Sequence, residues 1–151
     1  MKTKRSAFTL VEVLIVVVIM AILAAAIIPQ FSDSTQDAKL STAEFNWHTL
    51  MSQIELYKSQ HDGLVPAKLE NLTKKTDVDG TVNESTGKYG PYISELPANP
   101  WTGQNGVTEA ADQTAPIANS ANDGWHYNFS TGELWLAGKG TGGVFKAIGA
   151  D

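Results

Sequence analysis

Residues 8–31 read FTLVEVLIVVVIMAILAAAIIPQF, which is an almost continuous apolar stretch. Every residue from Val13 to Ile28 is apolar, and Glu12 is the one charged residue between positions 8 and 28. As a helix, residues 8–28 would be roughly 31 Å long at about 1.5 Å per residue, which is enough to cross the hydrocarbon core of a membrane. The stretch therefore predicts a membrane-spanning helix, and the remaining residues have room for one small polar domain.

Charge is distributed unevenly on the two sides of this segment. Lys2, Lys4 and Arg5 precede it, whereas the residues after it hold eight lysines, no arginine and every acidic side chain except Glu12. A basic flank stays on the cytoplasmic side of a membrane, so we expect the acidic domain to face outward. The formal net charge of −5 and the lack of clustered basic residues argue against nucleic acid as a partner.

The sequence contains no pattern that predicts catalysis. Without cysteine, thiol chemistry, cysteine zinc sites and stabilising disulfides are excluded. The histidines, His48, His61 and His126, are scattered along the chain, so a packing or surface role is expected for them rather than zinc binding. No Gly-x-Ser-x-Gly motif and no phosphate-binding glycine loop occurs. We therefore expect a protein that is not an enzyme.

Glu12 separates three interpretations of the apolar segment. A cleaved secretory signal has a shorter apolar core, and although residues 24–26 offer a small-residue cleavage site, the helical pattern continues directly beyond them. A plain membrane anchor explains the length and the orientation. It does not explain an ionised carboxylate, which costs about 2.5–3.5 kcal/mol at the bilayer centre. Glu12 is therefore expected to have a partner or to reach the membrane interface.

The residues around Glu12 resemble the processing site shared by type IV pilins and the pseudopilins of type II secretion. The resemblance covers SAFTLVEVLI at positions 6–15, and Pro29 stands at the position of the family proline. It implies that a prepilin peptidase cuts a short basic leader between Ala7 and Phe8, and that the new amine of Phe8 is N-methylated. Ala7 is a departure, because the family usually has glycine there.

The resemblance also implies roles for two residues in assembly. In the family, the glutamate at the position of Glu12 pairs with the N-terminal amine of a neighbouring subunit. A buried charge is tolerated when it is paired, so this pairing would fix the axial register of a filament. A contact between Glu12 and the amine of its own Phe8 is the alternative. Pro29 is expected to kink or loosen the helix without ending it.

Beyond the membrane segment, apolar residues recur at alternating spacings of three and four, which is typical of an amphipathic helix. They are Leu40, Ala43, Trp47, Leu50, Ile54 and Tyr57. One helix from about Phe8 to Gln60, stopped at Asp62-Gly63, is the simplest interpretation. A separate helix capped by Ser32 or Asp33 and a coiled coil are the alternatives.

The residues after Gly63 predict a small antiparallel β-sheet with long loops. The expected elements are a helical turn over 65–72, loops over 73–90 and 103–123, a hairpin with strands over 125–129 and 134–136, and a further short strand over 144–148.

This second half is similar to the major (G-type) pseudopilins, in which a Gly-Pro-Tyr…Leu-Pro…Asp-Pro-Trp run precedes the sheet. The run is present here from Gly90 to Trp101, with Asn99 in place of the usual aspartate. True major pilins commonly close a C-terminal loop with a disulfide, which this chain cannot form. The similarity therefore favours a pseudopilin over a pilin.

The resemblance implies one cofactor, since major pseudopilins hold a calcium ion in a loop between their last strands. Oxygen ligands on one flexible loop suit calcium, and Asp112, Asn122 and Asp123 are the candidates. The alternative is a solvated loop in which Asp and Asn simply favour turns. No other cofactor is expected.

Together these features predict an α+β, pilin-like fold in which one long helix packs on the small sheet. The expected parts are a basic leader over 1–7, a transmembrane and assembly half of the helix over 8–30, an amphipathic half over 31–62, and a small periplasmic region over 63–151.

The function implied is that of a structural subunit of the type II secretion pseudopilus, a periplasmic filament that drives protein export. Its expected partners are copies of itself, other pseudopilins, the prepilin peptidase, the inner membrane and the secretion platform in it. A type IV pilus pilin that serves adhesion, motility or DNA uptake is the first alternative. A membrane-tethered binding module or enzyme is the second.

Overall fold

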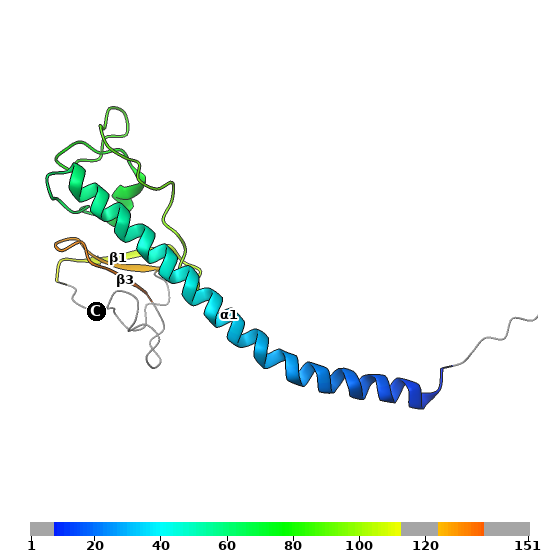
Figure 1. Ribbon diagram of the computed structural model, residues 1–151. Helices are drawn as coiled ribbons and strands as arrows, with labels where there is room; N and C mark the ends of the chain where they lie inside the picture. Colours follow the sequence, from blue (N-terminus) through cyan, green and yellow to red (C-terminus); the bar gives the residue numbers. More distant parts are fainter. Residues whose placement is uncertain (1–7, 113–123, 138–151) are drawn as a thin grey trace, which may run out of the picture. The chain divides into compact units, whose positions relative to one another are not determined.

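The computed structural model describes residues 8–112 and 124–137 (Figure 1). For residues 28–33 it describes the backbone alone. The chain divides into two compact units, Met1–Ala38 and Lys39–Asp151, and each is described by itself. Within the described residues the elements are the helix α1 (Leu10–Gln60), the short 3₁₀ helix η1 (Leu69–Thr73), and the strands β1 (Val107–Ala110), β2 (Trp125–Asn128) and β3 (Leu134–Leu136).

The first unit consists of the start of α1. The helix begins at Leu10, two residues later than expected, and continues through position 29 without a break. The predicted single helix is thus confirmed, and neither the proline nor Ser32 marks a helix end. The segment Leu10–Ile27 is long and apolar enough to cross a membrane, as the sequence predicts.

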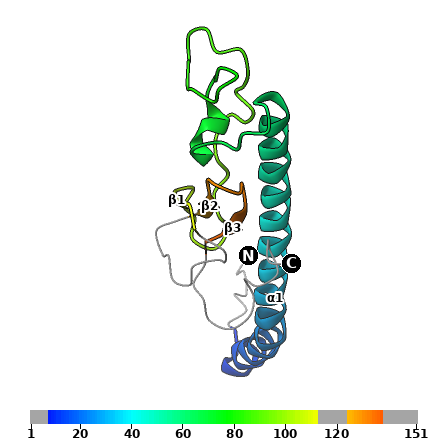
Figure 2. The same cartoon turned by 90° about the vertical axis from the view of Figure 1, so that its left-hand side faces the viewer.

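In the second unit, the remaining part of α1 packs its apolar stripe against the sheet and η1 (Figure 2). Four residues of the predicted stripe are fully buried, and Leu40 and Trp47 are half-buried against the same core. The buried four are Ala43, Leu50, Ile54 and Tyr57. They meet apolar side chains of η1, β2 and β3, so the stripe is the core face of a helix packed within its own chain.

The helix ends where the sequence predicts. Asp62 and Gly63 adopt positive φ angles of 52° and 86°, and the Gly63 amide donates to the Lys58 carbonyl at 2.9 Å. This is the left-handed stop that glycine favours. Directly beside it, the buried His61 ring stacks on Tyr57 with a centroid separation of 3.7 Å, and its Nε2 lies 2.9 Å from Thr76 Oγ1. His61 therefore has the packing role expected for it.

The sheet has the order β1-β2-β3, and it is mixed rather than antiparallel. β2 pairs antiparallel with β3 in the predicted hairpin, whereas β1 pairs parallel with β2, with Val107 opposite Trp125. The prediction of an antiparallel sheet is wrong at β1, because the sequence analysis placed Val107–Ala110 in a loop. The strand has only four half-buried residues and lacks the alternation that identifies a strand in a sequence.

The remaining predicted elements are a helical turn, a loop and a last short strand. The helical turn predicted over 65–72 is η1, which begins at Leu69 and buries Leu69 and Leu72. The loop expected over 73–90 is held by isolated bridges from Thr76 to Val82 and Tyr89. The strand predicted over 144–148 lies outside the described residues.

Candidate assembly site at the start of the long helix

The first turn of α1 is closed by reciprocal hydrogen bonds between Thr9 and Glu12. Glu12 Oε2 accepts from the Thr9 amide and from the Thr9 hydroxyl, both at 2.8 Å. In return, the Glu12 amide donates to Thr9 Oγ1 at 3.3 Å. Thr9 directly precedes the helix and Glu12 is its third residue, so Thr9-Leu10-Val11-Glu12 forms a capping box. This local bonding explains why the helix begins at Leu10 rather than at Phe8.

The capping box gives Glu12 a partner that the sequence analysis did not identify. The expected partners were an amine of a neighbouring subunit or the amine of Phe8, whereas here the carboxylate bonds to Thr9 through one oxygen, Oε2. The signal was present in the sequence, since Thr-x-x-Glu in front of an apolar run is the pattern of a capping box. Pairing of Glu12 with a neighbouring subunit stays a prediction.

The surface of the helix after this box is apolar on every side. The part of the chain that the structure describes buries none of the segment Leu10–Ile27. Leu10 is 82% exposed and Ile22 is 65% exposed, and the residues between them are exposed as well. A patch of this size is unstable in water and has to be covered by lipid tails or by other apolar helices.

The structure does not test the predicted cleavage site or the predicted kink in the helix. Ala7 lies outside the described residues, so the cut between Ala7 and Phe8 stays a prediction; Phe8 is 82% exposed in front of the helix. Position 29 is part of α1, and the kink expected at Pro29 stays a prediction as well.

The predicted calcium ligands are only partly described. Asp112 is exposed just beyond the carboxyl end of β1, whereas Asn122 and Asp123 lie outside the described residues. The connection that holds them leaves β1 at its carboxyl end and returns at Gly124, whose amide donates to Gly106 beside the amino end of β1. Parallel pairing thus puts Asp112 and Gly124 at opposite ends of the two strands.

The described residues do not test the predicted calcium site, because two of its three candidate ligands, Asn122 and Asp123, lie outside them. Calcium needs six to eight oxygen ligands. Among residues 8–112 and 124–137, no three His, Cys, Asp or Glu side chains lie close enough together to hold a metal ion. The calcium site stays a prediction of the sequence resemblance.

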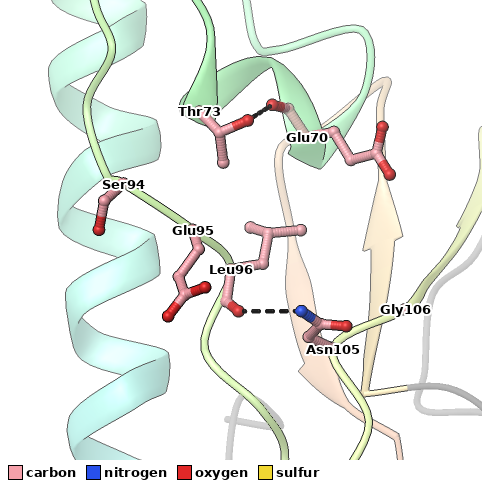
Figure 3. A pocket seen from close by; sticks show the side chains of 7 residues that line it. All are labelled: Glu70, Thr73, Ser94, Glu95, Leu96, Asn105 and Gly106. Carbon is pink, nitrogen blue, oxygen red and sulfur yellow. Dashed lines mark hydrogen bonds between the residues drawn. The ribbon is translucent and has the colours of Figure 1, made fainter.

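An open pocket of about 260 Å³ lies on the second unit (Figure 3). It is lined by Glu70, Thr73, Ser94, Glu95, Leu96, Asn105 and Gly106. The carboxylates of Glu70 and Glu95 point away from each other in Figure 3, and the Thr73 hydroxyl donates to the Glu70 backbone carbonyl at 2.8 Å. Among these described lining residues, no hydroxyl is paired with a carboxylate or imidazole as nucleophilic catalysis requires.

Comparison with known proteins agrees with the arrangement at the start of α1. Residues 2–28 match the family model of the prokaryotic N-terminal methylation motif, a range that includes Ala7, Phe8 and Glu12. No solved structure matches the chain significantly.

Three curated relatives have the same name, type II secretion system core protein G. The chain is 30% identical to the protein of Pseudomonas aeruginosa over 102 residues, which cover 66% of this chain and 70% of the relative. It is 29% identical to the protein of Aeromonas hydrophila over 107 residues, with the same coverage. The Vibrio cholerae protein is 29% identical over 98 residues, which cover 65% of this chain and 66% of the relative. With the methylation motif at its start and this similarity along two thirds of its length, the chain belongs to the family of type II secretion system core protein G, the G-type pseudopilins.

Proposed function

We propose that this chain is a structural subunit of a type II secretion pseudopilus. One observation carries the proposal: a single helix joins an exposed apolar segment, Leu10–Ile27, to a half that packs in the core of its own domain. Such a helix anchors the precursor in a membrane, and it becomes the core of a filament when the lipid around it is replaced by the helices of other copies.

Processing prepares the helix for this change of surroundings. The prepilin peptidase cuts between Ala7 and Phe8, and the amine of Phe8 is N-methylated. The capping box holds the Glu12 carboxylate at the helix start, and only Oε2 is used by Thr9. The positive amine of a neighbouring subunit then pairs with this carboxylate, because a charge buried in the filament core needs an opposite charge.

The basic residues before Phe8 keep that end of the precursor cytoplasmic, so the domain after the helix lies in the periplasm. In this place the subunit meets copies of itself, other pseudopilins and the secretion platform of the inner membrane. The growing filament pushes cargo proteins toward the outer membrane. The subunit acts mechanically, and it is not an enzyme.

The proposal is tested in a strain that lacks the gene and is complemented with the wild-type chain. In the deletion strain, secreted enzymes are expected to be lost from the culture medium and to accumulate in the periplasm. Complementation is expected to restore their export. Normal export in the deletion strain, together with loss of surface fibres, would instead identify a type IV pilin. Normal export with no change in surface fibres would favour the second alternative, a membrane-tethered binding module or enzyme.

A further inference from the structure

The part of α1 in the second unit has a side that faces away from the core. Figure 2 shows η1 and the three strands on one side of this helix. One line along the helix, at spacings of four, three and four residues, consists of Phe45, Thr49, Ser52 and Leu56. Ile54 of the buried stripe lies nine residues after Phe45, about two and a half turns, and therefore on the opposite side of the helix. We call the line from Phe45 to Leu56 the outer face.

Two large apolar side chains are exposed on the outer face. Phe45 is 71% exposed, more than any other large apolar side chain described in the second unit, and Leu56 is 43% exposed. Their positions are 11 residues apart, which corresponds to about 17 Å along the helix axis. A single exposed apolar residue needs no partner, so the character of the surface around and between the two side chains decides whether they form one contact.

The surface between these two side chains is uncharged, although the outer side of a surface helix usually carries charges. The lysine and glutamate residues of this part of α1 all lie at least roughly 80° around the helix from Phe45, at about 100° per residue. They are Lys39, Glu44, Glu55 and Lys58. The Thr49 hydroxyl donates to the Phe45 carbonyl and the Ser52 hydroxyl donates to the His48 carbonyl, both at 2.8 Å, so the helix itself uses both protons. The outer face is thus apolar at its ends, and it is shallow and uncharged between them.

A second copy of the chain is the molecule that fits this face. Lipid does not cover it, since Phe45 is 18 residues beyond Ile27, where the candidate membrane span ends, and the polar residues 32–37 lie between them. In a filament, the apolar segments of neighbouring helices pack on each other in place of lipid, and the outer face belongs to the same continuous helix. Because the outer face is uncharged, a neighbouring copy can cover it without leaving a buried charge unpaired.

We propose that the outer face is a contact between copies of this chain, with Phe45 as its anchor. Aromatic side chains are enriched at such contacts, and charged side chains are depleted from their centres. Two large side chains are too few for a stable dimer, which buries about 800 Å² on each partner. The contact therefore forms when the apolar segments already hold the copies together, and the second unit alone stays a monomer. The inference rests on the proposed function and adds to it a contact outside the apolar segment.

Photo-crosslinking identifies the molecule that covers the outer face. The photoreactive amino acid p-benzoylphenylalanine is placed at position 45 of the full chain, and cells that hold the peptidase and the secretion platform are illuminated. Position 129 is the matched control, because Phe129 is also a partly exposed phenylalanine of the second unit but lies in the turn between β2 and β3. A product with the mass of two copies is expected from position 45, with much less of it from position 129. A product of another mass from position 45, no product there, or equal amounts from both positions would overturn the proposed contact.

Phe45→Ala and Phe129→Ala measure the effect of the contact on assembly. Phe45→Ala is expected to lower the amount of sedimentable filament at least about tenfold, whereas Phe129→Ala assembles like the wild type. Because Phe45 is exposed, its variant is expected to be cleaved normally and to melt within a few degrees of the wild type when purified in detergent. Wild-type amounts of filament with Phe45→Ala would contradict the role of Phe45. A wild-type chain that forms no filament at all is a different result, which would contradict the proposed function itself.

Discussion

Among the single residues, Glu12 makes one interaction that the structure shows, and a second interaction is proposed for it. Its hydrogen bonds to Thr9 close the first turn of the helix, which is worth about 1 kcal/mol in other helices. Pairing of its charge is the proposed second contribution, because a carboxylate in an apolar filament would need a cation beside it. A glutamine keeps the first contribution and removes the second, since glutamine also closes a capping box.

Glu12→Gln and Glu12→Val are therefore expected to be cleaved and methylated normally, and both are expected to reduce the assembled fraction at least about tenfold, the equivalent of 1.4 kcal/mol. The assembled fraction is measured by shearing and sedimentation of overproduced filaments. If Glu12→Gln assembles like the wild type and only Glu12→Val fails, the capping box is the essential contribution and charge pairing is wrong.

Tyrosine side chains in the second unit are expected to make the free energy of unfolding depend on pH in the alkaline range. Burial, with a smaller effect of the Glu109 carboxylate, raises the pKa of Tyr127 well above its ordinary value of about 10, and burial raises the pKa of Tyr92 to about 12. Between the unfolded and the folded pKa, the unfolded chain releases protons that the folded chain keeps, so stability falls as pH rises above about 10. Below that pH the contribution is fully present.

Tyr127→Phe is expected to lower the free energy of unfolding by about 1 kcal/mol at neutral pH, because the 2.8 Å hydrogen bond from its hydroxyl to the Pro66 carbonyl is lost. The same variant is expected to lose less stability than the wild type between about pH 9 and pH 11. Urea unfolding at several pH values measures both effects. An unchanged alkaline slope would show that Tyr127 does not carry the pH dependence.

Among the helices and strands, those that depend on local sequence patterns are predicted correctly, and the one that depends on contacts far apart in the sequence is not. The apolar stripe from Leu40 to Tyr57, the stop at Asp62-Gly63 and the hairpin of β2 and β3 are set by local patterns, and the structure confirms them. The parallel partner β1 was missed because its pairing depends on contacts with residues 18 positions further on, as in Val107 with Trp125. Asn99 looked like a minor departure from a motif, and only the folded chain brings its amide to Gly124 and Ala137.

The backbone of Gly124, just before β2, lies against residues 104 and 105 and leaves no room for a side chain. Gly124→Ala is expected to lower the free energy of unfolding by about 3 kcal/mol, because its Cβ would meet the backbone of residues 104 and 105, which cannot move as a flexible side chain does. Gly103→Ala is the control, since it has open space and only a φ of 69° to accommodate, at a cost of about 1–2 kcal/mol. Chemical denaturation of both variants measures the difference, and an equal or smaller effect at Gly124 would contradict the close approach.

At the scale of the whole molecule, the two units differ in what covers their apolar residues. The second unit buries its own core from α1, η1, β2 and β3, whereas the described residues leave the segment Leu10–Ile27 uncovered. Among the described residues, the long apolar segment that needs a membrane or other copies to cover it therefore lies in the first unit.

Deleting residues 1–28 is expected to give a soluble, folded monomer, because the core described for the second unit stays complete. Size-exclusion chromatography and circular dichroism check the mass and the fold. A fragment that aggregates would show that the helix stripe or the sheet edge needs neighbours even without the apolar segment.

The proposed function requires that a membrane-anchored precursor is converted into a filament subunit at the start of its helix. Mass spectrometry of the chain purified from cells that hold the prepilin peptidase tests this most directly. The expected mature protein begins at Phe8 and carries one methyl group on its N-terminal amine, while cells without the peptidase keep the leader. A chain that retains residues 1–7 in the presence of the peptidase, or that is cut elsewhere, would contradict it.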